Sequence, residues 1–185
     1  MSANRTPLAS RAVGRWIRRP GELVTWCAPD GLRLDGFYAP APRDSPSPWP
    51  LVILIHGMFS NFYRSPLKSA LFEHLPRAGL PLLSINNRGA EAGTAHEVFE
   101  ASFRDLDAAV SFAREIGRHR VVLIGHSTGC QKALHWADRR RARGLAALVL
   151  LAPCDDCAIV RRELGPQWRA MIRRARAKVR SGRGD

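Results

Sequence analysis

Residues 121–129 read VVLIGHSTG: four aliphatic residues, then a serine with a glycine two positions before it and another two positions after it. A short aliphatic run rich in β-branched residues is typical of a strand that is buried on both faces of a parallel sheet. A helix-like segment follows, so Gly125 to Gly129 predicts a tight strand-to-helix turn. Side chains at its two ends would collide with neighbouring elements, which explains the glycines. We expect Ser127 to lie above the carboxyl end of a sheet, with a strained backbone.

Strand-like and helix-like segments alternate on both sides of this turn. The expected strands are Glu22 to Cys27, Leu32 to Tyr38, Leu51 to Ile55, Leu80 to Asn86, Val121 to Ile124 and Leu145 to Ala152. The expected helices are residues 67–78, with Leu67, Leu71 and Leu75 on one apolar face, 96–116, 130–143 and 160–179. Residues 29–31, Pro-Asp-Gly, predict a hairpin turn between the first two strands. The alternation predicts an α/β fold, a mostly parallel sheet with helices on both faces.

Most of the net charge of +13 lies at the two ends of the chain. Residues 1–20 hold five arginines and no acid, and residues 158–185 hold nine basic and two acidic residues. We therefore divide the chain into a basic leader (1–20), an α/β core (21–157) and a basic helix (158–185) that would begin a lid or linker. No nucleic-acid motif accompanies the arginines, so we expect a solvated surface and neither nucleic acid nor a membrane as partner. The oligomeric state stays open.

The four cysteines point to a reducing compartment. Cys154 and Cys157 have the C-x-x-C spacing of redox or metal sites, but there is no second such pair and no thioredoxin-like context. The N-terminal arginines are not followed by the apolar stretch of a secretory signal. We expect reduced thiols, a cytoplasmic location, and neither a metal nor an organic cofactor.

Five segments occur in an order that resembles the α/β-hydrolase superfamily. They are LVILIHGM, SINNRG, FRDLDAAVSFA, VVLIGHSTG and LVLLAP, and the resemblance runs from about Glu22 to Pro153. It is closest to the serine aminopeptidase/esterase-like branch, in which a GHSTG nucleophile elbow precedes Cys-Gln. The resemblance implies a serine hydrolase that cleaves a small-molecule ester or amide through an acyl-enzyme.

The resemblance also assigns roles to the residues of the motif. Ser127 would be the nucleophile, in an elbow formed with Gly125, His126 and Gly129. The oxyanion hole would consist of the backbone N–H groups of Thr128 and Met58, with Phe59 as the alternative to Met58. We assign structural roles to His126 and to His56, which precedes the loop glycine.

The remaining members of a catalytic triad are not evident. In this superfamily an acid and then a histidine follow the nucleophile. The acid would be Asp155 or Asp156, although loop capping explains either equally well. The only histidine after Ser127 is His135, on a helix that leads away from the site. We favour a hydrolase fold that is C-terminally incomplete; a complete, non-catalytic binding or scaffold protein is the alternative.

The basic C-terminal helix allows a further hypothesis. Its apolar side chains would share one side and its arginines the other, as in an amphipathic arm for membranes or nucleic acid. The apolar residues are Ile159, Leu164, Trp168, Met171 and Ile172. We favour the plainer interpretation of a solvated helix over the mouth of the site.

Overall fold

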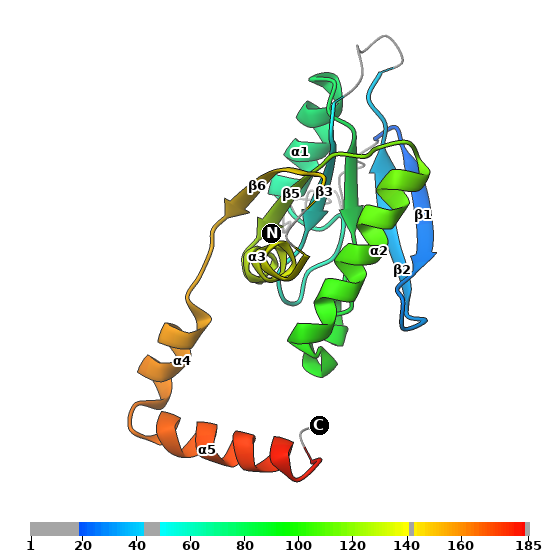
Figure 1. Cartoon of the computed structure of the whole chain (residues 1–185). Helices are drawn as coiled ribbons and strands as arrows, with labels where there is room; N and C mark the ends of the chain where they lie inside the picture. The colour runs from blue at the N-terminus through cyan, green and yellow to red at the C-terminus, as the bar shows by residue number, and fades with distance from the viewer. Residues whose placement is uncertain (1–18, 43–48, 141–142, 184–185) are drawn as a thin grey trace, which may run out of the picture.

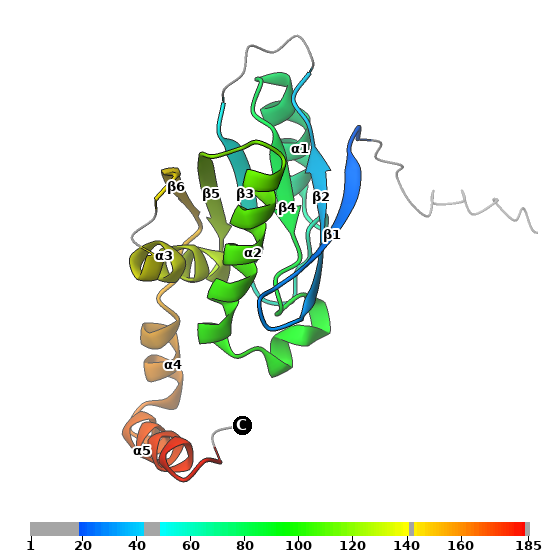
Figure 2. The same ribbon diagram turned by 45° about the vertical axis from the view of Figure 1, so that its right-hand side comes forward.

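A six-stranded sheet forms the centre of the protein in a computed structural model that describes residues 19–42, 49–140 and 143–183. The strands are β1 (Glu22–Cys27), β2 (Arg33–Ala39), β3 (Leu51–Ile55), β4 (Leu82–Ile85), β5 (Val121–His126) and β6 (Leu145–Leu151). Their order is β1-β2-β4-β3-β5-β6 (Figures 1 and 2). The β1–β2 hairpin and the β2–β4 pair are antiparallel, and the other pairs are parallel. The expected mostly parallel α/β sheet is confirmed.

Helices cover both faces of this sheet. They are α1 (Pro66–Arg77), α2 (Ser102–Glu115), α3 (Thr128–Arg140), α4 (Asp156–Leu164) and α5 (Gln167–Arg180), with 3₁₀ turns η1 (Glu91–His96) and η2 (Phe99–Ala101). Helices α2 and α3 pack on one face and α1 packs on the other, so each face has its own apolar core. The five residues of β3 are all buried, as expected of a central parallel strand.

Helix α1 buries a different face from the one predicted. Lys68, Phe72 and Pro76 are its buried residues, and Leu71 and Leu75 pack beside them only half-buried. The stripe is displaced by one residue because the amine of Lys68 has acceptors inside the protein. Its Nζ donates to Ser60 Oγ at 2.7 Å and to the carbonyl oxygen of Asn61.

The single helix predicted for residues 96–116 is wrong. Glu97 and Val98 have extended backbones, so two 3₁₀ turns precede α2. This break lets Glu97 turn inward, where its carboxylate forms an ion pair with Lys132 of α3, and both side chains are buried. The carboxylate also fills the space over Gly89 that a Cβ atom would occupy. A long-range ion pair therefore interrupts the local helical pattern.

The C-terminal helical segment is also interrupted. Gly165, with φ of 50°, and Pro166, which has no N–H to donate, separate α4 from α5. Neither helix has a buried residue. Both views show the two helices standing clear of the sheet, beyond the carboxyl end of β6 (Figures 1 and 2). Strand β6 is the edge of the sheet and pairs only with β5 in the described part of the chain.

Three further expectations concern the leader, a membrane span and the cysteines. Residues 1–18 of the expected basic leader lie outside the described residues. No helix in the described ranges is long and apolar enough to cross a bilayer. All four cysteines are free thiols.

A buried ion pair joins α2 to the loop after β4. Asp105, fully buried on α2, accepts hydrogen bonds from the backbone N–H of Arg88 at 2.7 Å and from its guanidinium at 2.7 and 3.0 Å. Arg88 also reaches Asp30 in the β1–β2 turn at 3.0 Å. Three segments far apart in sequence are thus tied together by one guanidinium group.

We expect Asp105→Ala to lower the free energy of unfolding by about 3 kcal/mol, because the largely buried Arg88 loses its fully buried partner and keeps only the pair with Asp30. The matched control is Asp35→Ala, which removes the exposed pair with Arg33 at 3.5 Å and should cost about 1 kcal/mol or less. Urea unfolding at neutral pH measures both. Equal losses for the two variants would contradict the structural role of the buried pair.

Candidate active site

Ser127 is the single residue between the end of β5 and the start of α3. Its φ is 54°, a left-handed value that is uncommon for a residue with a side chain. Its N–H donates to the carbonyl oxygen of Leu151 at 3.0 Å, and its own carbonyl accepts from Cys130 N–H at 2.9 Å. The turn is thus held to β6 on one side and to the first turn of α3 on the other, and the half-buried serine lies at the carboxyl end of the sheet.

Three glycines surround this serine because backbones approach each other closely here. A Cβ atom on Gly125 would lie 2.5 Å from the carbonyl oxygen of Gly129, and one on Gly129 would collide with that of Ile55. A Cβ on Gly57 would lie 2.8 Å from the Cβ of Ser127 and 3.2 Å from its Oγ. The first two glycines let α3 start against β3, and the third leaves room for the serine side chain.

The loop after β3 brings a backbone donor next to the turn. The N–H of Met58 donates to Thr128 Oγ1 at 2.9 Å, so the Met58 amide faces the residue that follows Ser127. The N–H of Phe59 donates instead to Thr94 Oγ1 at 2.9 Å. Of the two oxyanion candidates in this loop, Met58 is therefore the one that the structure brings to the turn.

Lys68 holds the continuation of this loop. Nothing in the sequence indicated this role, since a lone lysine in an amphipathic helix is expected to point into solvent. Its side chain is buried, and its amine donates to Ser60, Asn61 and Arg64, all neutral oxygens. Burial, helped by the charge of Arg64, lowers the pKa of Lys68 to about 8. The amine anchors residues 60–64 to α1.

Neither of the two histidines of the motifs forms a hydrogen bond with the serine hydroxyl. His56 is fully buried, and its Nδ1 lies 2.7 Å from the carbonyl oxygen of Gly57. Burial lowers the pKa of His56 to about 4, and the positive charges of Lys132 and Lys68 act in the same direction. This histidine is therefore neutral at physiological pH and holds the glycine loop. His126 is half-buried in the turn.

The candidate acids and His135 lie in other interactions. Asp155 caps α4 by accepting the N–H of Ala158 at 2.9 Å. Asp156 accepts from Gln131 Nε2 at 2.9 Å and from the thiol of Cys154 at 3.1 Å. The ring of His135 packs against that of Phe99, 5.5 Å away. The structure does not bring these groups together around Ser127.

The cysteines near the turn have packing roles. The thiol of Cys130 points to the carbonyl oxygens of Gly125 and Leu151, at 3.2 and 3.3 Å, and burial raises its pKa. Gln131 donates to the carbonyl oxygen of Cys154 at 2.7 Å, which ties the start of α4 to α3. Among the described residues, no group of three or more metal-ligating side chains occurs.

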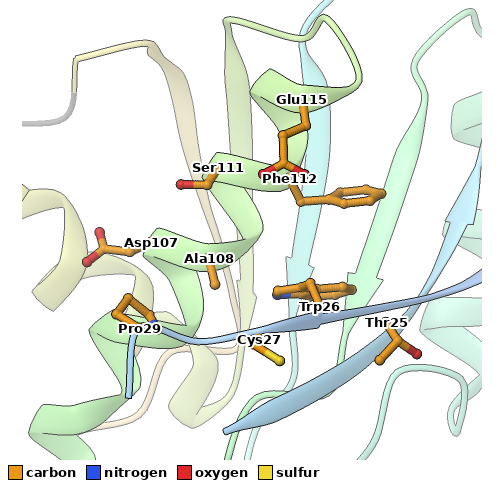
Figure 3. Close-up of a pocket in the computed structure, with 9 residues that line it drawn as sticks. All are labelled: Thr25, Trp26, Cys27, Pro29, Asp107, Ala108, Ser111, Phe112 and Glu115. Atoms are coloured by element: carbon orange, nitrogen blue, oxygen red, sulfur yellow. The ribbon is translucent and has the colours of Figure 1, made fainter. Parts of the chain in front are cut away.

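Two hollows lie away from Ser127. One, of about 460 Å³, opens between β1 and α2, where Trp26 stacks on Phe112 with ring centroids 5.5 Å apart (Figure 3). The other, of about 350 Å³, lies between α2 and α3 and is lined by Trp136 and Arg140. None of the predicted site residues lines either hollow.

We expect the imidazole of His56 to titrate at about pH 4, as followed by nuclear magnetic resonance of its ring nitrogens. Unfolded chains take up this proton near pH 6.5, so His56 should lower the stability of the fold as the pH falls from about 6.5 to about 4. His56→Gln should reduce this loss. Titration of His56 at its ordinary pKa would contradict the burial described above.

We expect Thr128→Val to remove the acceptor of the Met58 amide and to speed hydrogen exchange at that amide by roughly tenfold, the worth of one hydrogen bond. Thr128→Ser keeps the hydroxyl and should exchange like the parent protein. Exchange read by nuclear magnetic resonance at residue 58 decides the matter. Unchanged protection in the valine variant would show that another group holds the amide.

Both the sequence and the fold of this chain are similar to those of known proteins. Residues 52–184 match the model of the alpha/beta hydrolase family. No curated protein matches the sequence. Among solved structures, a putative hydrolase from Agrobacterium vitis S4 superposes with a TM-score of 0.66 at 16% identity, over 82% of this chain and 60% of its own.

Two esterases show the same fold. A highly thermostable carboxyl esterase from Bacillus coagulans has a TM-score of 0.63 at 14% identity, over 88% of this chain and 51% of its own. The esterase Pf2001 from Pyrococcus furiosus has a TM-score of 0.62 at 22% identity, over 77% of this chain and 56% of its own. The chain thus spans between half and three fifths of these structures, and it belongs to the alpha/beta hydrolase family.

Proposed function

We propose that this protein is a serine hydrolase in which Ser127 forms an acyl-enzyme with an ester or amide substrate. The observation that carries the proposal is the left-handed φ of Ser127 in a turn that permits no side chain at Gly125 or Gly129. A fold that only needed a helix cap would not require this strained conformation. The strain is characteristic of a nucleophile elbow, in which the hydroxyl is lifted toward a substrate.

The proposed reaction follows the chemistry of acyl transfer. The Oγ of Ser127 bonds to the substrate carbonyl carbon while its proton passes to a base, and the leaving group departs with a proton. Water then attacks the acyl-enzyme, releases the acid and restores the serine. The backbone N–H groups of Thr128 and Met58 would hold the oxyanion, with the Met58 donor exchanging its bond to Thr128 Oγ1 for one to the substrate.

The base is the part of the mechanism for which the described residues offer no candidate. Neither a histidine nor a carboxylate in the described ranges hydrogen-bonds to the Ser127 hydroxyl. Asp155 instead caps α4, and Asp156 accepts a hydrogen bond from Gln131. This observation favours the second candidate function, a binding or scaffold protein that uses the fold without catalysis. Four free thiols fit a cytoplasmic location for either function.

A fluorophosphonate probe tests the proposal on the purified chain. We expect the probe to label Ser127, with loss of fluoride, and added imidazole to accelerate labelling because it can act as the base. Ser127→Ala should abolish labelling, and Ser111→Ala, which changes an exposed serine of α2, should label like the parent chain. A folded chain that stays unlabelled with imidazole present would exclude the nucleophile and support the scaffold function.

A further inference from the structure

Helix α5 presents an apolar stripe with cations on both sides. Its apolar residues recur with the i, i+3, i+4, i+7 and i+11 spacing of one helix face; they are Trp168, Met171, Ile172, Ala175 and Val179. The helix has six basic residues and no acidic one; they are Arg169, Arg173, Arg174, Arg176, Lys178 and Arg180. At 100° per residue, Arg173 and Arg176 fall on one side of the stripe and Arg174 and Lys178 on the other.

The part of the chain that the structure describes does not cover this stripe. Met171 and Val179 are 41% and 66% exposed, and no residue of α5 is buried. The main neighbour of α5 is α4, where Arg161 stacks on the ring of Trp168 at 5.5 Å from its centroid. Both views show α5 beyond the carboxyl end of the sheet and clear of the body (Figures 1 and 2).

We propose that α5 binds the surface of an anionic phospholipid bilayer, with its apolar stripe among the acyl chains and its arginines among the headgroups. A helix of this kind lies in the plane of the interface. The long side chains of its arginines and lysine extend toward the lipid phosphates, so that their charged ends stay at the headgroups. Trp168 is suited to the boundary between apolar and polar layers. The cytoplasmic leaflet carries the negative charge that such a helix requires.

Other occupants fit the same face less well. A second copy of α5 would place arginines against arginines along the edges of the stripe, which costs energy. A nucleic acid would match the arginines but would leave Met171, Ile172 and Val179 in water. The sequence predicted an apolar side for this segment, and its exposure in the structure now favours the amphipathic arm over a merely solvated helix. The proposal is independent of the catalytic role of Ser127.

Vesicle co-sedimentation of the full chain tests the proposal. We expect binding to vesicles of phosphatidylcholine with roughly a quarter phosphatidylglycerol, and binding at least about tenfold weaker to phosphatidylcholine alone. High salt should weaken binding to the anionic vesicles as well. Equal binding to both kinds of vesicle, or to neither, would overturn the proposal.

Matched variants separate the stripe from the charge. Met171→Gln with Val179→Gln removes apolar area at two exposed positions without changing the charge, and we expect roughly tenfold weaker binding. Ala170→Gln with Ala177→Gln introduces the same two glutamines at exposed positions on the opposite side of the helix and should bind like the parent chain. Equal binding by the two variants would overturn the role of the stripe. Binding to duplex DNA but not to vesicles would assign the helix to nucleic acid and overturn the proposal.

Discussion

The carboxyl end of the sheet depends on how closely three backbones approach one another. The first turn of α3 lies so near β3 that the position of a Cβ on Gly129 is taken by the carbonyl oxygen of Ile55. The same approach places Gly57 against Ser127 and the Met58 amide against Thr128. If α3 moved outward by the width of a methyl group, Ser127 could relax its backbone, and the loop after β3 would lose its contact with the turn.

Buried charges then hold the loops around this close contact. Lys68 ties residues 60–64 to α1, Lys132 holds Glu97 against Gly89, and Arg88 joins Asp105 to the β1–β2 turn. Breaking one partner of a buried pair costs far more than removing an exposed one. The loops are therefore ordered by a few directional interactions, while the strands below them are ordered by apolar packing.

Sequence patterns predicted the parts of the fold that repeat locally. The runs at β3 and β5 and the glycines of the turn were recognisable because burial on both faces and steric exclusion each leave a mark within a few residues. The break at Glu97, the buried face of α1 and the hydrogen bonds of Asp156 to α3 were not, because each depends on a partner outside its own segment: Lys132, the carbonyl of Asn61 and the side chain of Gln131. A residue's partner across the fold leaves no periodic signal in its own segment.

The hydrogen bond between the Met58 amide and Thr128 Oγ1 has a consequence for selectivity. An oxygen atom that approaches this amide must displace a hydroxyl that already satisfies it. A neutral carbonyl exchanges one neutral acceptor for another and gains little, whereas a negatively charged oxygen forms a bond about twice as strong. In the proposed reaction, the Thr128 hydroxyl would thus hold back a resting ester carbonyl and give way to the developing oxyanion, which would favour the transition state over the ground state.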